Sequence, residues 1–502
     1  MPYAIENKDI LSRATEIALK RYDYTPNKSY RTSRIIRIPV AIVLFISLMG
    51  SMPLLVVPYL SDRSAYASAV IDLQKPTNVS NNPSHSKYQN LLVVNEHVYV
   101  VWMDGDDTIP KFNIYFKASH DHGKTFSPAI KLSDGGQNLP PIIAAFGNDV
   151  YVTWLHEGNG DFGAKFRASH DNGNSFDPRL DFGSDTWYAR VDIAAYDNNV
   201  YLVFEHPATP GNEAIFQASH DRGVTFGEPF VFRSGPCAGG DPHIAAWKNN
   251  IYITAQDPCE GHPDLLFRVS HDSGSTFSDA MYLGDGSQQV KIVTKGKYVY
   301  LAWNQNADDV NFRVSSDYGN TFAPTRNMEG NDLNVANPIP QIAISGKNDV
   351  YVLWQSNIFP IFSNSSSSND VNGADPIKTH LFIRASYNNG QDFGSIVRLD
   401  SDQDYSYNTQ LAASGNDVFV IWQNVSAFWT PSGSEILFKM SNDKGATFGD
   451  TVVIDNDTGD SLGSVRPDVD VRTNWLYVSW WHSNELDGSP DVYMQRGKIH
   501  GH

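Results

Sequence analysis

The chain has 502 residues and a formal net charge of −18; 41% of its residues are hydrophobic and 12% are aromatic. This composition suits a globular core and excludes a disordered chain. Nucleic-acid binding requires a basic surface that displaces counterions, so the negative charge predicts no nucleic-acid partner. The two cysteines, Cys237 and Cys259, are too few for a small disulfide-stapled module.

An uncharged apolar stretch of 22 residues lies at 39–60, and it is long enough to cross a bilayer as a helix. Four basic residues precede it: Lys28, Arg31, Arg34 and Arg37. Because positive charge stays on the cytoplasmic side, we expect everything after about residue 61 to lie outside.

The expected organisation is a cytoplasmic tail at 1–33, a transmembrane signal anchor at 34–61, a juxtamembrane linker at 62–69 and one large domain at 70–502. The chain would then be a single-pass protein of the cell membrane. The alternative is a signal peptide cut near Ala67 or Ala69, which would secrete the same domain.

A short aromatic strand pattern recurs eight times, and six of its seven intervals fall between 48 and 58 residues. The copies are VYVVW at 98–102, VYVTW at 150–154, VYLVF at 200–204, IYITA at 251–255, VYLAW at 299–303, VYVLW at 350–354, VFVIW at 418–422 and LYVSW at 476–480. The one longer interval contains a serine-rich insertion at 363–370. Four antiparallel strands repeated about every 50 residues predict an all-β β-propeller, with eight blades or, as the alternative, seven.

The last repeat has no obvious fourth strand, whereas VIDLQ at 70–74 has the pattern of a fourth strand and no partner nearby. We predict that 70–74 pairs with the last blade and closes the ring, since closure removes free sheet edges. The alternative is a disordered stalk next to the membrane.

A polar turn of the type SHDHGKTF lies between the third and fourth strands of seven repeats. The Asp is expected to accept backbone N–H bonds, and the Gly to adopt a left-handed conformation. The residues at the Asp position are Asp121, Asp171, Asp221, Asp272, Asp317, Asn388 and Asp443. The sixth turn departs from the pattern, with Asn388 for Asp and Asp392 for Thr, and is expected to be looser.

This turn is similar to the Asp-box, or BNR repeat, of sialidases and related propellers. The resemblance covers 70–502 and implies that these residues are structural and lie opposite the active site. It implies an exo-acting glycoside hydrolase only if the sialidase residues are present: three arginines, a tyrosine activated by a glutamate, and an aspartate. The Arg37-Ile38-Pro39 motif lies at the cytoplasmic mouth of the apolar stretch and cannot reach an outside active site. This leaves Arg190 and Arg466, one short of three.

The loops that enter the first strands and leave the second strands collect charged groups. The ligand-binding candidates are Arg190, Glu205, His206, Asp241, His243, Asp257 and Arg466. Further carboxylates and histidines there are Asp104, Asp106, Asp107, His156, Glu157, Asp308, Asp309, Asp455, Asp457 and Asp460. No cofactor is firmly expected, although carboxylate oxygens are ligands that calcium accepts.

The two cysteines flank the first hairpin of the fourth blade, and a disulfide between Cys237 and Cys259 is expected outside the cytoplasm. Glycosylation sequons begin at Asn78, Asn364, Asn424 and Asn456. We therefore expect a cell-surface propeller that binds an extracellular glycan or protein. A glycoside hydrolase and a structural envelope component remain as alternatives.

Overall fold

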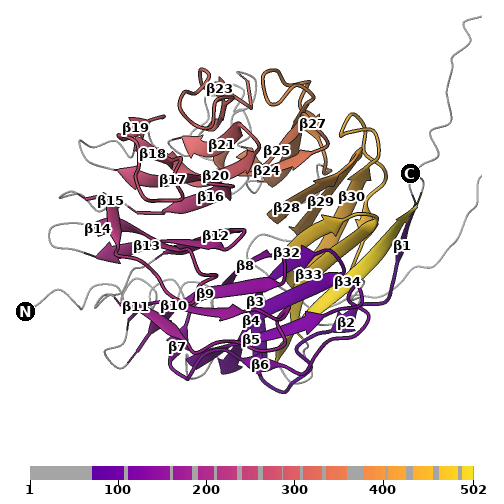
Figure 1. Cartoon of the computed structure of the whole chain (residues 1–502). Helices are drawn as coiled ribbons and strands as arrows, with labels where there is room; N and C mark the ends of the chain where they lie inside the picture. The colour runs from indigo at the N-terminus through magenta and orange to yellow at the C-terminus, as the bar shows by residue number, and fades with distance from the viewer. Residues whose placement is uncertain are drawn as a thin grey trace, which may run out of the picture. The chain divides into compact units, whose positions relative to one another are not determined.

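The computed structural model describes residues 70–106, 111–158, 162–183, 190–207, 212–234, 240–257, 264–284, 287–305, 309–330, 335–358, 378–401, 405–425, 434–455, 463–483 and 489–500. These residues form eight antiparallel sheets arranged as a β-propeller (Figure 1). Within them, no helix has the length and apolar character needed to span a bilayer. The predicted tail, anchor and linker at 1–69 lie outside the described residues, so these three expectations stay predictions.

Each sheet is one blade, and its strands follow chain order from the axis outward. The first strands are β3 (His85–Val94), β8 (Ile142–Phe146), β12 (Val191–Tyr196), β16 (His243–Trp247), β20 (Ser287–Lys295), β24 (Val335–Ser345), β28 (Ser406–Ser414) and β32 (Gly463–Arg472). The second strands are β4 (His97–Asp106), β9 (Asp149–Glu157), β13 (Asn199–Pro207), β17 (Asn250–Asp257), β21 (Tyr298–Gln305), β25 (Asp349–Ile358), β29 (Asp417–Asn424) and β33 (Trp475–Ser483).

The outer strands complete the blades. The third strands are β5 (Lys111–Ser119), β10 (Gly163–Ser169), β14 (Asn212–Ser219), β18 (Asp264–Ser270), β22 (Asp309–Ser315), β26 (Lys378–Ser386), β30 (Glu435–Ser441) and β34 (Pro490–His500). The fourth strands are β6 (Ile130–Lys131), β11 (Leu180–Gly183), β15 (Phe230–Arg233), β19 (Met281–Tyr282), β23 (Arg326–Asn327), β27 (Val397–Arg398), β31 (Val452–Val453) and β1 (Val70–Leu73). Two short strands are added at β2 (Thr77–Asn78) and β7 (Gln137–Asn138).

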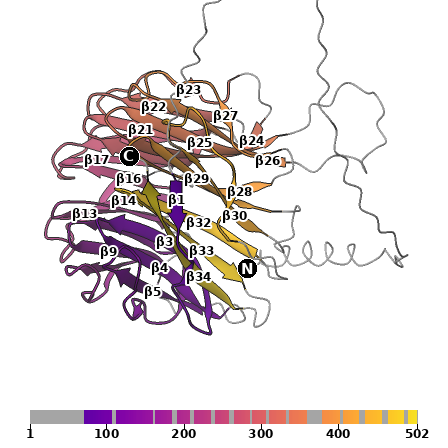
Figure 2. The same ribbon diagram turned by 90° about the vertical axis from the view of Figure 1, so that its right-hand side faces the viewer.

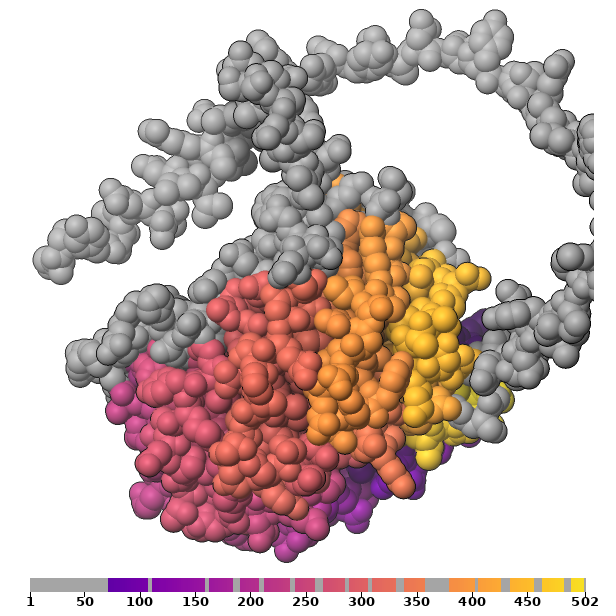
Figure 3. Space-filling view, turned by 90° about the horizontal axis from the view of Figure 1, so that it is seen from above, coloured from indigo at the N-terminus to yellow at the C-terminus, as the bar shows by residue number. Residues whose placement is uncertain are grey.

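The first strands contact one another in sequence around the axis, and β32 returns to β3. Small residues such as Ala144, Ala145 and Ala412 let these strands converge. The second strands carry the large aromatic side chains that fill the space between blades. Six tryptophans there are no more than 1% exposed: Trp102, Trp154, Trp303, Trp354, Trp422 and Trp480. Figure 3 shows neighbouring blades as adjacent sectors in chain order, as the repeat predicts.

The ring is closed by the predicted N-terminal strand. β1 pairs antiparallel with β34, with Val70 opposite His500 and Leu73 opposite Gly497. Figure 2 shows the indigo β1 near the yellow β34, although the two lie at opposite ends of the described chain. The prediction that residues 70–74 complete the last blade is confirmed.

The seven polar turns lie at one end of the propeller, here called the box end. Each turn donates a backbone N–H to the hairpin between the first and second strands of its own blade, as from Asn172 to Asn148 (2.9 Å) and from Arg222 to Asn198 (2.8 Å). The opposite end, here called the loop end, carries the connections that leave the second strands and enter the first strands.

Within a box turn, the carboxylate satisfies several donors at once. Asp121 accepts the Ser119 hydroxyl (2.8 Å), the Thr125 N–H (2.9 Å) and the Thr125 hydroxyl (2.8 Å). Partial burial would raise the pKa of Asp121, but these bonds lower it to about 2. This carboxylate is therefore ionised and fully used by its own turn.

The sixth turn keeps this network with a different pair of side chains. The Asn388 Oδ1 accepts the Ser386 hydroxyl and the Asp392 N–H, each at 2.9 Å. The Asn388 amide then donates to the Asp392 carboxylate (3.1 Å), in the place of the Thr-to-Asp bond of the other turns. The two departures from the motif compensate each other, so the turn retains the bonds of its neighbours.

The substitution Asn388→Asp is expected to place a second carboxylate beside that of Asp392, in place of the amide that now donates to it. The lost bond and the repulsion should lower the free energy of unfolding by about 1 kcal/mol. The double variant Asn388→Asp, Asp392→Thr restores the arrangement of the other turns and should recover stability. Calorimetric unfolding checks this, and equal stability of the single and double variants would contradict it.

Candidate functional site

The best-connected group of predicted residues lies at the loop end, between the third blade (β12–β15) and the fourth blade (β16–β19). Arg190 immediately precedes β12, and its carbonyl accepts the N–H of Glu205 at the end of β13 (2.9 Å). Its Nη1 donates to the Asp241 Oδ1 at 2.6 Å, across the seam to the fourth blade. The Arg190 side chain is 63% exposed and that of Asp241 is 10% exposed. A buried carboxylate thus orients an exposed guanidinium.

His243, the first residue of β16, lies between two carboxylates. Its Nε2 is 3.4 Å from the Asp241 Oδ1, and its Nδ1 is 3.5 Å from the Asp192 Oδ2. Asp192 also accepts the N–H of Ile244 (3.2 Å), which links the two blades. Burial would lower the pKa of His243, but Asp192 and Asp241 raise it to about 9. His243 is therefore a cation at neutral pH.

This pairing predicts a loss of stability in alkaline solution. The pKa of His243 is higher in the folded chain than the value of about 6.5 expected in the unfolded chain. Its contribution to the free energy of unfolding is therefore complete below about pH 6.5 and disappears as the pH rises through about 9. We expect the free energy of unfolding to decline by on the order of 2 kcal/mol across this pH range. Thermal unfolding between pH 6 and 10 measures it. His243→Gln should remove this part of the decline, and an unchanged decline in that variant would refute the assignment.

Glu205 lies beside this group and is 8% exposed. Its Oε1 accepts the Asn212 amide at 2.5 Å, and a Cβ on Gly240 would lie 2.4 Å from the same oxygen. A side chain at position 240 would therefore have to displace the Glu205 carboxylate. Burial raises the pKa of Glu205, although Asn212 and Arg190 oppose the rise. Burial would also raise the pKa of Asp241, but His243 and Arg190 bring it below its usual range.

Four neighbouring first strands also line an open cavity of about 250 Å³. Asp192, His243 and Lys291 line it, together with apolar residues of β8, β12, β16 and β20. The Arg190 group is therefore continuous with the wall of this cavity, which adds the positive charge of Lys291.

Asp257 lies further out on the fourth blade and is linked to Glu205 through Arg233 and Asn212, because the Arg233 Nη1 donates to the Asn212 carbonyl and the Asn212 amide donates to Glu205. The guanidinium of Arg233, whose side chain is 1% exposed, lies 3.0 Å from the Asp257 Oδ1. The Tyr282 hydroxyl donates to its Oδ2 (3.2 Å). The imidazole of His206 pairs elsewhere, with its Nδ1 3.7 Å from Glu213.

Arg466 lies at the seam of the eighth and first blades. Its guanidinium is 4.6 Å from the centre of the Tyr88 ring, which is 6.4 Å from the ring of Trp481. The first strands β3 and β8 lie between β32 and β12, so Arg466 and Arg190 are not on neighbouring strands. The structure does not place these two arginines in one cluster.

Four of the remaining candidates are paired locally. Asp104 accepts from Asn82 and Ser86, His156 bonds to Asn138, Asp309 accepts from Asn327, and Asp455 is 3.3 Å from His482. No group of three or more acidic, histidine or cysteine side chains suited to a metal occurs among the described residues. The candidates that lie outside the described residues are Asp107, Cys237, Cys259, Asp308, Asn364, Asn456, Asp457 and Asp460. Of the two described sequon asparagines, Asn78 donates to Asp491 (2.8 Å) and Asn424 ends β29.

Several residues of these clusters were not predicted. Asp192 and His243 occupy equivalent positions in β12 and β16, so an alignment of the first strands could have identified Asp192. Asn212 and Lys291 carry no such signal, because their neighbours differ from blade to blade. Arg233 follows an apolar run on an outer strand, and nothing in the sequence indicates its burial.

No protein family matches the sequence, and neither does any curated protein. Solved structures of similar fold include a Dyadobacter fermentans protein of unknown function (TM-score 0.42, 12% identity, 86% of this chain and 99% of that one). An ulvan lyase has a TM-score of 0.41 and 12% identity, over 60% of this chain and 81% of that one. A Trypanosoma rangeli sialidase in complex with sialic acid has a TM-score of 0.39 and 10% identity, over 84% of this chain and 58% of that one. Likenesses this distant leave the function to be argued from the residues of this chain, which is an eight-bladed β-propeller.

Proposed function

We propose that the chain is a cell-surface binding propeller that holds a carboxylated glycan at its loop end. The observation that carries the proposal is the geometry of Arg190, whose exposed guanidinium is fixed through one nitrogen by the buried Asp241. Among the described residues, Asp241 is its one ion-pair partner, so other N–H donors of the fork face solvent. Arginine forks of this kind bind carboxylates through two parallel hydrogen bonds.

The surroundings of Arg190 favour an anionic ligand despite the negative net charge of the chain. The cationic His243 and Lys291 line the adjoining cavity. The two carboxylates nearest to His243 are already engaged with it, which leaves the exposed charge of this group positive. A glycan is favoured over a protein because the group is small and polar, whereas protein interfaces have apolar centres.

The direction of the chain is compatible with display from a membrane. Val70 is opposite His500, and the N–H of Ile499 donates to Asn474 in the hairpin of the last blade, so β1 begins at the box end. We propose that the anchor at 34–61 holds the propeller at the cell surface. Cleavage near Ala67 or Ala69 would release the same binding end in secreted form.

The test is a binding screen of the purified protein on immobilised glycans, carboxylated and neutral, with calcium or with a chelator. We expect retention on carboxylated glycans. Retention on neutral glycans alone would overturn the choice of ligand, and retention that the chelator removes would show that calcium takes part.

A glycoside hydrolase is the second candidate, and one observation favours it. The pKa of Glu205 is raised and that of Asp241 is lowered within the same group, which is the arrangement that gives one carboxyl an acid role and leaves another ionised. A panel of fluorogenic glycosides, sialosides included, separates the two functions. Turnover that Glu205→Gln abolishes would make the chain an enzyme, and binding without turnover supports the first proposal.

A further inference from the structure

The box turns seal the seams between blades. In five seams, the box phenylalanine packs edge-on against a phenylalanine on the third strand of the preceding blade, with ring centres 4.9–5.2 Å apart; the pairs are Phe116–Phe176, Phe166–Phe226, Phe216–Phe277, Phe267–Phe322 and Phe312–Phe393. The box glycine lies against the same ring, since a Cβ on Gly173 would be 2.6 Å from the Phe116 ring. Each of these five seams is thus closed at the box end by an aromatic side chain of the following blade.

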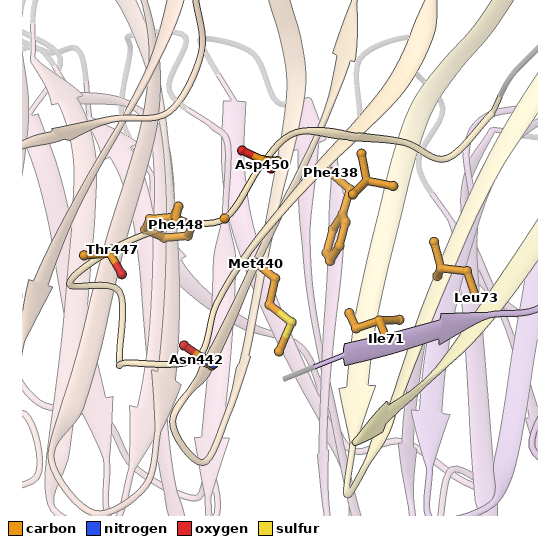
Figure 4. Close-up of a pocket in the computed structure, with 10 residues that line it drawn as sticks. Ile71, Leu73, Phe438, Met440, Asn442, Thr447, Phe448 and Asp450 are labelled. Atoms are coloured by element: carbon orange, nitrogen blue, oxygen red, sulfur yellow. The ribbon is translucent and has the colours of Figure 1, made fainter. Parts of the chain in front are cut away.

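The eighth blade has no box, because its fourth strand comes from the N-terminus of the domain. Phe438 of the seventh blade, which is equivalent to Phe116, therefore has neither a box glycine nor a box phenylalanine against it. Instead, a pocket of about 370 Å³ lies there, here called the seam groove; it is lined by Ile71, Leu73, Phe438, Met440 and Phe448 and by residues of the seventh box turn (Figure 4).

We propose that the chain just before β1, residues 65–69, folds back into the seam groove and places the ring of Tyr66 against Phe438 and Met440. β1 forms one wall of the groove through Ile71 and Leu73, so the preceding residues start at the groove itself. Val70 comes four positions after Tyr66, a reach of up to about 13 Å. Tyr66 is the one aromatic residue in 61–69.

The chemistry of the groove selects an aromatic occupant. The equivalent position in five other seams holds a phenylalanine, and Phe438 and Met440 offer the same ring and thioether surface. The Asn442, Thr447 and Asp450 side chains at the groove provide polar partners that a tyrosine hydroxyl can use and a phenylalanine cannot. The occupant also depends on processing, because cleavage near Ala67 or Ala69 would remove Tyr66 and leave the groove open.

The test uses the full chain with a photoreactive benzoylphenylalanine in place of Tyr66, followed by mass spectrometry of the crosslinked peptides. We expect crosslinks to residues 438–452 of the same chain, and their loss when Met440→Glu places a charge in the groove. Should Met440→Glu fail to fold, Asn442→Trp blocks the groove from its edge. The same probe in place of Tyr24 is the control and should not label 438–452.

Mixing isotopically light and heavy chains distinguishes the occupants. Crosslinks within one chain support the proposal. Crosslinks from Tyr66 to 438–452 of another chain would overturn it in favour of a second copy, and crosslinks that avoid 438–452 would overturn it altogether. None of these outcomes depends on whether the loop end binds a glycan.

Discussion

Removal of residues 1–75, which deletes the closing strand β1, is expected to lower the free energy of unfolding by about 3 kcal/mol. Ile71 and Leu73 pack against the last blade, and burial of each such side chain contributes roughly 1.5–3 kcal/mol before the entropy of ordering the strand is subtracted. The loss also exposes the edge of β34, and an unpaired edge promotes association between chains. Thermal unfolding and size-exclusion chromatography measure the two effects.

Two variants isolate the strand from the segment before it. Removal of residues 1–69 keeps β1 and should cost much less stability. Gly497→Val keeps the whole chain but places a Cβ 2.5 Å from the Cγ2 of Ile71, which should displace β1 and reproduce most of the loss. If the truncations at 69 and 75 were equally stable, ring closure by β1 would not hold the last blade.

Arg190→Ala is expected to weaken binding of a carboxylated glycan by roughly 10- to 100-fold. Hydrogen bonds to a charged group contribute about 1.5–3 kcal/mol, and each 1.4 kcal/mol corresponds to a factor of ten. Arg190→Lys should recover part of the affinity, because it keeps the charge and loses the planar fork. Isothermal titration of the glycan into each variant gives the ratios.

The matched control is Arg222→Ala, which removes a 47% exposed arginine at the box end. This variant should bind like the unaltered chain. Equal losses in both variants would show that the glycan responds to overall charge rather than to a site, and an unaffected Arg190→Ala would remove Arg190 from the binding surface.

The architecture of the propeller could be predicted because the same local sequence pattern recurs from blade to blade. A buried aromatic such as Trp154 and a box residue such as Asp171 recur at fixed positions, so each copy supports the assignment of the others. The closing strand followed from a missing partner: the last blade lacked a fourth strand, and Val70–Leu73 supplied one. Compensation in the sixth turn escaped prediction because Asn388 and Asp392 depart from the motif together.

The candidate site was only partly predictable because its residues come from different blades. Arg190 and Asp241 are 51 positions apart in the sequence, and their contact depends on how two blades pack. Asp257 was expected on the same surface, and it reaches the Arg190 group only indirectly, through the buried Arg233 and Asn212. The loop sequences do not repeat from blade to blade, so they do not indicate which residues will be partners. The sequences of the strands that position these loops do repeat.

The most direct test of the central claim is hydrogen–deuterium exchange of the propeller with and without the carboxylated glycan that the screen identifies. We expect slower exchange in peptides that contain 190–193 and 240–244, with no change in the seven box turns. Protection confined to the box turns, or to surfaces away from the third and fourth blades, would contradict the assignment of the binding site to the loop end at Arg190.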